Sequence, residues 1–243
     1  MGRPGAPWAR VVLKISGEAL ASDAADEVID GRVVERLARE VAGARAELGT
    51  EIAIVVGGGN IWRGATGSAS GMDRATADYM GMLATVINAL ALRDALERQG
   101  QPTRVQTAIG MSELAEPYIR LRAIRHLEKG RVVLFAAGTG NPFFTTDTAG
   151  ALRAVEIGAD ILLKGTHGDV EGVYTADPRV DPNALPLHEI GYGEVLAKDL
   201  RAMDLTGITL CKENSLPILY FSIAKEGNLR SALAGEEIGT LIH

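Results

Sequence analysis

The sequence predicts an α/β protein whose central, largely parallel sheet lies between helical layers. Short apolar runs rich in Val and Ile alternate with longer amphipathic stretches along the chain. Several of the short runs are apolar at consecutive positions, as expected for strands that are buried on both faces of a parallel sheet. Regular alternation of strands and helices places helices on both faces of such a sheet.

The expected elements follow in chain order. Strands are predicted at Val11–Ile15, Ile52–Val56, Val105–Thr107, Val132–Ala136, Ile161–Leu163 and Ile218–Phe221, and Gly239–Ile242 could add a closing strand. Helices are predicted at Val33–Leu48, Ala75–Arg98, Ile119–Leu127 and Thr146–Ile157. In the second helix, the i, i+3, i+4, i+7 spacing predicts a core-facing stripe of Leu83, Val86, Ile87 and Leu90. The segment Gly165–Pro186 is rich in Gly, Asp and Pro and is expected to form a flap or ligand loop.

Composition limits the class of protein. The chain has 243 residues, of which 47% are hydrophobic and 23% charged, the balance of a globular protein. We interpret residues 10–243 as a single domain after a flexible tail of residues 1–9. The net charge of −6 argues against nucleic acid as the main partner, because surfaces that track phosphates are usually basic.

The compartment is inferred from cysteine and apolar content. Cys211 is the single cysteine, so no intramolecular disulfide can form, and a free cysteine is more often a small buried hydrophobe than a catalytic thiol. The N-terminus does not resemble a signal peptide, and no apolar run approaches the roughly 18 residues of a membrane helix. We therefore expect a cytoplasmic protein with no membrane partner.

Two glycine-rich turns follow predicted strands, at Gly57–Asn60 (GGGN) and Gly138–Asn141 (GTGN). Ligands of parallel sheets bind beyond the carboxyl ends of the strands, and glycine lets backbone N–H groups approach a phosphate. The glycines could instead serve tight turns alone, but two such loops at equivalent strand ends favour phosphate binding. Neither loop matches the Walker pattern or the dinucleotide fingerprint, which disfavours a P-loop kinase and an NAD enzyme.

Charged and hydroxyl side chains accompany these turns. Lys14 lies in an apolar strand, where its charge is costly unless it reaches water or an anion. Arg63 follows the triple-glycine turn and could bind a phosphate in a fork, or be a solvated loop residue. Thr145, Thr146 and Asp147 open a predicted helix, either as its cap or as a ligand cradle at its N-terminus.

Several segments together resemble the bacterial UMP kinases of the amino acid kinase superfamily. They are Lys14–Glu18 (KISGE), Gly57–Arg63 (GGGNIWR), Asp78–Thr85 (DYMGMLAT), Gly138–Asp147 (GTGNPFFTTD), Val173–Pro178 (VYTADP) and Met203–Asp204. The resemblance runs from about Arg10 to Ile242 and implies a sandwich with a mainly parallel sheet of about eight strands between helical layers. It also implies a homohexamer, ATP and UMP as substrates, and GTP and UTP as effectors. Because Mg²⁺ usually binds nucleotide phosphates with water completing its shell, we expect it to be carried by ATP rather than by a protein metal site.

The resemblance also implies roles for individual residues. The catalytic group would be Lys14, Arg63, Asp147 and Asp204, with Asp204 orienting Lys14. ATP would be bound by Lys14, Ile15, Ser16, Gly17, Gly59, Arg63, Thr166, Tyr174 and Asp177. UMP would be bound by Gly58, Asp78, Thr139, Gly140, Asn141, Pro142, Phe143, Phe144, Thr145 and Thr146.

Two regions depart from the family pattern. Between Thr166 and Tyr174 the chain reads HGDVEGV, where the family usually has the shorter KVDGV, so the adenine loop is expected to differ in shape. Arg93, Arg104 and Arg131 match arginines that contact GTP in the family. Glu97 and Arg120, however, replace a histidine and a tryptophan of one branch, so a weaker GTP response is expected.

The expected chemistry needs no general base. A phosphate monoester has its second pKa near 6, so the attacking oxygen is already mostly ionised at neutral pH. The histidines, His126, His167, His188 and His243, lie outside the matched motifs and are expected at surface or loop positions. Two alternatives remain: a relative that phosphorylates a carboxylate or carbamate, and a non-catalytic nucleotide storage or sensor protein on the same fold.

Overall fold

The computed structural model describes residues 7–22, 27–69, 71–168, 171–176, 181, 183–198, 200 and 202–243. Nine strands form one sheet in the order β4-β3-β5-β2-β1-β6-β10-β11-β9. They are β1 (Arg10–Ile15), β2 (Glu51–Val56), β3 (Thr103–Thr107), β4 (Glu116–Pro117), β5 (Val132–Ala136), β6 (Ile161–Thr166), β9 (Glu189–Ile190), β10 (Ile218–Ser222) and β11 (Thr240–Ile242). All neighbours in this sheet are parallel except β10 and β11. The predicted mainly parallel sheet is confirmed, and Gly239–Ile242 does supply a strand.

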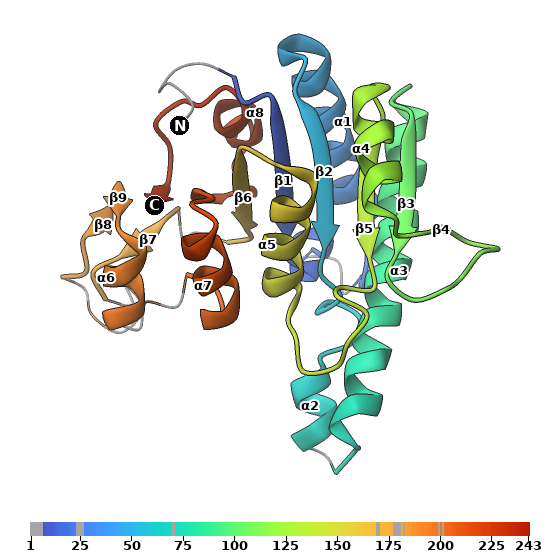
Figure 1. The fold of residues 1–243 in the computed structure, drawn as a ribbon, viewed down its shortest axis with the longest axis horizontal. Helices are drawn as coiled ribbons and strands as arrows, with labels where there is room; N and C mark the ends of the chain where they lie inside the picture. Colours follow the sequence, from blue (N-terminus) through green and yellow to red (C-terminus); the bar gives the residue numbers. More distant parts are fainter. Residues whose placement is uncertain are drawn as a thin grey trace.

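Helices cover both faces of the sheet (Figure 1). One layer contains α1 (Gly31–Leu48), α3 (Arg74–Arg98) and α8 (Asn228–Leu233), and the other contains α4 (Arg120–Glu128), α5 (Thr146–Ile157) and α7 (Leu205–Glu213). Shorter helices are η1 (Gly17–Leu20), α2 (Gly64–Ala69) and α6 (Tyr192–Ala197). Each layer closes its own apolar core against one side of the sheet. The strands β1 and β2 contribute to both cores, which explains their consecutive apolar residues.

Side-chain caps fix where the long helices begin. Asp30 accepts a hydrogen bond from Arg32 N at 2.8 Å before α1, and Asp73 accepts one from Thr76 N at 2.8 Å before α3. Thr145 and Asp204 do the same for α5 and α7. Because a capped first turn satisfies N–H groups that have no helical partner, these residues set the positions of the helix N-termini.

The predicted stripe on α3 is only partly correct. Val86 is buried, but Leu83 and Ile87 are 48% and 50% exposed. The buried side of α3 carries small and mixed side chains such as Ala77, Ala84 and Asn88. Because α3 is apolar on several faces, its periodicity could not decide which face meets the sheet.

The length of α3 agrees with the predicted Ala75–Arg98, but the helix is more apolar than expected. Within the described residues it is the one helix that is long and apolar enough to cross a membrane by length and composition. In the fold, α3 instead packs against α1, β3 and β5 as a helix of the protein core.

Two short segments complete the fold. β7 (Val173–Tyr174) and β8 (Pro186–Leu187) form a separate antiparallel pair within the predicted flap region. Near the N-terminus, Trp8 donates from its backbone N to Leu233 O and from its indole Nε1 to Ala232 O, both at 3.2 Å. This part of the predicted tail is therefore attached to α8.

Candidate active site

Two turns at the carboxyl edge of the sheet pack directly against each other. One is Ser16–Gly17 after β1, and the other is Gly57–Gly59 after β2, where Gly57 N donates to Ile15 O at 2.9 Å. A Cβ on Gly57 would lie 2.7 Å from Gly17 N, and one on Gly17 would lie 2.6 Å from Gly59 N. Only glycine fits these positions, because any side chain would collide with backbone.

The same turns present unused hydrogen-bond donors. Within the described part of the chain, the N–H groups of Gly17, Gly58 and Gly59 have no hydrogen-bond acceptor. Converging backbone N–H groups of this kind form an anion-binding concavity. The turns are therefore suited to phosphate groups, as the sequence predicts.

A buried ionic cluster lies beside these turns. The register of the parallel pair β1–β6 places Lys14 next to Lys164, and both ammonium groups contact Asp147 at the start of α5. The distance from Lys14 Nζ to Asp147 Oδ1 is 2.6 Å. The three side chains are only 9%, 12% and 14% exposed for Lys14, Lys164 and Asp147. Two cations share one anion, so the cluster keeps a net positive charge with which to attract a phosphate.

The cluster shifts the proton affinities of its members. Burial alone would raise the pKa of Asp147, but the charges of Lys14 and Lys164 outweigh burial and lower it. Burial lowers the pKa of Lys164, and the like charge of Lys14 adds to this effect. Lys164 was missed in the sequence, although a lysine that ends the apolar run Ile161–Leu163 gives the same signal as Lys14.

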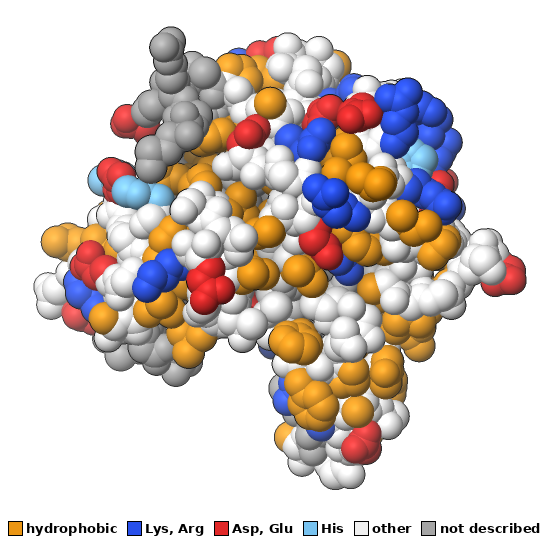
Figure 2. Space-filling view, in the orientation of Figure 1, with side chains coloured by type: hydrophobic (Ala, Val, Ile, Leu, Met, Phe, Trp, Pro, Cys, Tyr) orange, Lys and Arg blue, Asp and Glu red, His pale blue; other side chains and the backbone are white. Residues whose placement is uncertain are grey.

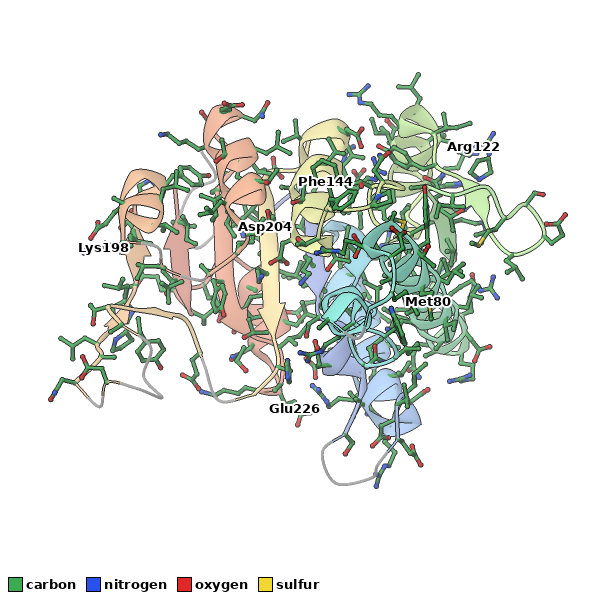
Figure 3. All side chains as sticks on the ribbon, turned by 90° about the horizontal axis from the view of Figure 1, so that it is seen from below. Met80, Arg122, Phe144, Lys198, Asp204 and Glu226 are labelled. Atoms are coloured by element: carbon green, nitrogen blue, oxygen red, sulfur yellow. The ribbon has the colours of Figure 1, made fainter. Side chains whose placement is uncertain are left out.

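The expected role of Asp204 as the partner of Lys14 is wrong, because Asp147 makes that contact. Asp204 instead accepts hydrogen bonds from Thr148 Oγ1 at 2.8 Å, from Gly207 N at 2.9 Å and from Thr145 Oγ1 at 2.5 Å. Figure 3 shows Asp204 between the start of α7 and the helix α5. Its carboxylate joins the first turns of two helices, and its negative charge also acts on Lys164, where it opposes the lowering of the pKa of that lysine.

Arg63 lies over the triple-glycine turn and pairs with Glu18. Its Nη2 contacts Glu18 Oε1, and its Nε lies 3.4 Å from Gly59 O. Burial would raise the pKa of Glu18, but its own backbone N–H and the charges of Arg63 and His167 lower it. The Arg63 side chain is 62% exposed, so its guanidinium is accessible to a phosphate. Sequence reasoning did not single out Glu18.

A cleft of about 180 Å³ opens next to these groups. It is bounded by α3, the triple-glycine turn and the loop before α5. Of the residues predicted for UMP, it is lined by Gly58, Asp78, Thr139, Asn141, Phe144, Thr145 and Thr146. Lining residues that sequence reasoning missed are Trp62, Gly64, Gly81, Met82 and Thr85. The indole Nε1 of Trp62 donates to Ala77 O at 2.9 Å, which fixes the ring against α3.

Asp78 connects α3 to the loop before α5. It accepts from Arg74 Nε at 2.9 Å and from Phe143 N at 2.8 Å. Phe143 has a φ of 72°, an unusual value for a residue other than glycine, and this N–H contact holds it there. Asp73 caps α3, so Asp78 is free of that duty and its carboxylate lines the cleft.

The remaining residues of the loop before α5 turn sharply. Gly138 and Gly140 have φ values of 58° and 80°, and a Cβ on Gly140 would lie 3.0 Å from Ala108 O. Pro142 is half-buried within this loop. Gly140, Pro142 and Phe143 therefore shape the loop, although they do not line the cleft.

The residues predicted for the ATP nucleoside are less concentrated. Thr166 ends β6, and its Oγ1 donates to Phe221 O at 3.1 Å. Tyr174 is half-buried in β7, and Asp177 lies outside the described residues. Ile15 is buried at the end of β1, where its carbonyl accepts from Gly57 N.

Two of the arginines predicted to bind GTP lie on α3 and on β3, the strand next to the edge strand β4. Arg93 and Arg104 line a hollow that also includes Glu97 and Glu116. Glu97 Oε1 lies 3.5 Å from Arg104 Nη1 and also accepts from Thr103 N at 2.8 Å. The carboxylate of Glu97 therefore already pairs with Arg104, one of the cations that an anionic effector would use.

Arg131 does not line this hollow, but it is connected to Glu116 of the hollow through His126. Its Nη1 donates to His126 Nδ1 at 2.9 Å, so the ring proton of a neutral His126 lies on Nε2, which faces Glu116 Oε2 at 2.9 Å. His126 is 9% exposed, so the expectation of a surface position is wrong for this histidine. Figure 2 shows Lys and Arg side chains concentrated around α4 on this part of the surface.

The chain is similar to the amino acid kinase family and to several uridylate (UMP) kinases. The profile of the amino acid kinase family matches residues 9–221. The chloroplastic uridylate kinase PUMPKIN of Arabidopsis thaliana is 59% identical over 241 residues, which are 99% of this chain and 70% of that protein. The UMP kinase structure from Bacillus anthracis has a TM-score of 0.93 at 39% identity, covering 98% of this chain and 96% of that one. That from Ureaplasma parvum has a TM-score of 0.90 at 38% identity, covering 97% and 98%.

Proposed function

Since the chain belongs to the amino acid kinase family, we propose that it is a UMP kinase, which transfers the γ-phosphate of ATP to UMP and releases UDP and ADP. The observation that carries this proposal is that the cleft and the phosphate turns adjoin each other. A cleft walled by Asp78 opens at Gly58 and Gly59, which belong to the same phosphate turns that adjoin Lys14 and Asp147. The uridylate kinases among the relatives support UMP as the acceptor.

The acceptor is bound by charge and hydrogen bonding. The carboxylate of Asp78 accepts hydrogen bonds from the ribose hydroxyls, and Thr139, Asn141, Thr145 and Thr146 supply polar groups to the base and phosphate. Asp78 would repel a carboxylate substrate. This argues against the alternative that the chain phosphorylates an amino acid derivative.

The reaction depends on positioning and electrostatic stabilisation. The phosphate of UMP is mostly dianionic at neutral pH, so its oxygen attacks without a base. Lys14, Lys164, Arg63 and the N–H groups of Gly17 and Gly59 stabilise the negative charge on the transferring group. Asp147 pairs with both lysines through its two oxygens and so holds both ammonium groups at the start of α5. A storage or sensor protein has no need of this arrangement of cations, which disfavours that alternative.

Mg²⁺ enters with ATP. Among the described residues no group of three or more His, Cys, Asp or Glu could hold a metal ion. Asp147 pairs with two lysines, and Asp204 accepts hydrogen bonds from hydroxyl and N–H donors. With both carboxylates engaged in this way, the site fits a Mg²⁺ ion that is held by the nucleotide phosphates and water. When bound, the ion neutralises phosphate charge.

Assembly, regulation and location are part of the same proposal. Tyr79, Leu83 and Ile87 follow one another at four-residue spacing on α3 and are 45–50% exposed, which suits contact with a second copy of the chain in a homo-oligomer such as a hexamer. GTP and UTP act as effectors at the hollow of Arg93 and Arg104, with a weak GTP response because Glu97 competes for Arg104. The enzyme works in the cytoplasm, and neither nucleic acid nor a membrane is a partner.

Product identification tests the proposal. The protein is incubated with γ-labelled ATP and UMP, and the nucleotides are separated by ion exchange. The label is expected to move to UDP, in an amount equal to the ADP formed. Release of label as free phosphate at the same rate with and without UMP would contradict the proposal.

A further inference from the structure

His167 lies at the carboxyl edge of the sheet, immediately after β6. Its ring Nδ1 is 3.3 Å from Ser16 Oγ, which follows β1. Because β1 and β6 are neighbours, this contact joins the ends of two adjacent strands at the phosphate turns. His167 also belongs to the segment in which the chain departs from the family pattern.

The contact with Ser16 determines which atom the ring presents outward. When the serine hydroxyl donates to Nδ1, the proton of a neutral ring lies on Nε2. When the ring is protonated, Nδ1–H donates to the hydroxyl and Nε2 again carries a proton. His167 is exposed, and Nε2 has no partner among the described residues. Nε2 therefore carries an N–H donor for a ligand when the serine hydroxyl donates to Nδ1 or when the ring is protonated. If the hydroxyl instead donates to Glu18, with which Ser16 also hydrogen-bonds, a neutral ring donates from Nδ1 and only the protonated ring presents Nε2–H.

The surroundings indicate what that ligand is. Ser16 precedes Gly17, whose N–H has no acceptor in the described part of the chain. Glu18 lies close enough to His167 to interact with its charge, and Arg63 pairs with the same carboxylate. Two side chains that can carry positive charge therefore interact with Glu18, beside the turns that suit phosphate.

We propose that His167 is a binding residue for the triphosphate of the nucleotide donor, with Nε2–H donating to a phosphate oxygen while Ser16 holds the ring. The inference rests on the proposed function in taking ATP as the donor. No proton is transferred, because the acceptor phosphate is already ionised, so the role of His167 is to bind and orient.

Calorimetric titration of the full chain with ATP, AMP and UMP tests this role. In His167→Ala the Kd for ATP is expected to rise about tenfold, which corresponds to about 1.4 kcal/mol. The Kd values for AMP and UMP are expected to change less than about twofold, because neither ligand extends phosphates to this position. His167→Lys restores a donor and is expected to bind ATP within about threefold of wild type. His188→Ala, at an exposed position away from the turns, is the matched control.

Two results would overturn the inference. One is an unchanged Kd for ATP in a His167→Ala protein with the wild-type melting temperature. The other is an equal loss for ATP and AMP, which would indicate distortion of the loop rather than loss of a phosphate contact. If the wild type binds no ATP, the proposed function fails and the inference falls with it. Normal ATP binding by the wild type separates the two cases.

Discussion

At the scale of residues, the central feature is one buried carboxylate shared by two lysines. Asp147 neutralises one of the two charges, and the remaining charge stays available at the phosphate turns. Buried ionic groups are costly unless they are paired, so an unshared lysine in the apolar strand β1 or β6 would be destabilising. In the proposed reaction, a substrate phosphate would neutralise the remaining positive charge.

Lys14→Ala is expected to lower kcat by at least about 100-fold, the scale of losing one preorganised electrostatic group. The Kd for UMP should be nearly unchanged, and the fold should be retained because Lys164 still pairs with Asp147. Steady-state kinetics and calorimetry measure both quantities, with the exposed Lys198→Ala as control. Near-normal turnover in a folded Lys14→Ala protein would remove Lys14 from the mechanism.

The lowered pKa of Asp147 makes part of the stability depend on pH. Its folded pKa lies below the ordinary value of 3.8, so the stabilisation is present above about pH 3.8 and is lost as pH falls through the folded pKa. Asp147→Asn should lower the free energy of unfolding at pH 7 by roughly 3–5 kcal/mol. Urea unfolding at pH 7 and at pH 3 should show this gap narrowing at the lower pH. A gap of equal size at both values would mean that the carboxylate charge is not responsible.

At the scale of elements, the periodic signals predicted the framework but not which side chains meet. Helix and strand positions followed from apolar runs, and the glycine turns indicated that a ligand binds at the carboxyl edge of the sheet. The partner of Lys14 did not follow, because Asp147 and Asp204 both stand at helix N-termini and only the packing of α5 across β1 and β6 selects Asp147. The pairing of Lys164 with Lys14 did not follow either, because strand register rather than chain spacing brings these two residues together.

Two aspartates near the start of α3 are expected to have different roles: Asp78 binds the acceptor, and Asp73 caps the helix. Asp78→Asn should raise the KM for UMP about 10- to 150-fold, the effect of losing a charged acceptor worth roughly 1.5–3 kcal/mol, and should change the KM for ATP much less. The matched control is Asp73→Ala, which removes the cap and should cost about 1 kcal/mol of stability with little effect on either KM. Equal KM values for UMP in wild type and Asp78→Asn would exclude Asp78 from the acceptor site.

At the scale of the whole molecule, the exposed apolar face of α3, which was predicted to face the core, suits contact with a second copy of the chain. Leu83 and Ile87 do not enter the core of one chain, yet they are as apolar as core residues. Figure 2 shows hydrophobic side chains on the projecting end of the molecule that contains α2 and the start of α3. Exposed apolar side chains that lie together on one element are typical of subunit contacts.

Leu83→Glu is accordingly expected to shift the protein toward smaller species in sedimentation velocity, because a charge buried in an interface is not compensated. Leu185→Glu alters a side chain that is also exposed, at 65%, but lies outside α3. It should leave the sedimentation coefficient unchanged. A Leu83→Glu protein that sediments like the wild type would show that this face of α3 is not an interface.

The identity of UMP as the acceptor is tested most directly by ADP release from ATP with a panel of acceptors at equal concentration. The wild type should be fastest with UMP, slower with dUMP because Asp78 loses a ribose hydroxyl, and should show negligible release with aspartate, glutamate derivatives or carbamate. A kcat/KM for any of these carboxylate or carbamate acceptors that equals or exceeds the value for UMP would contradict the account.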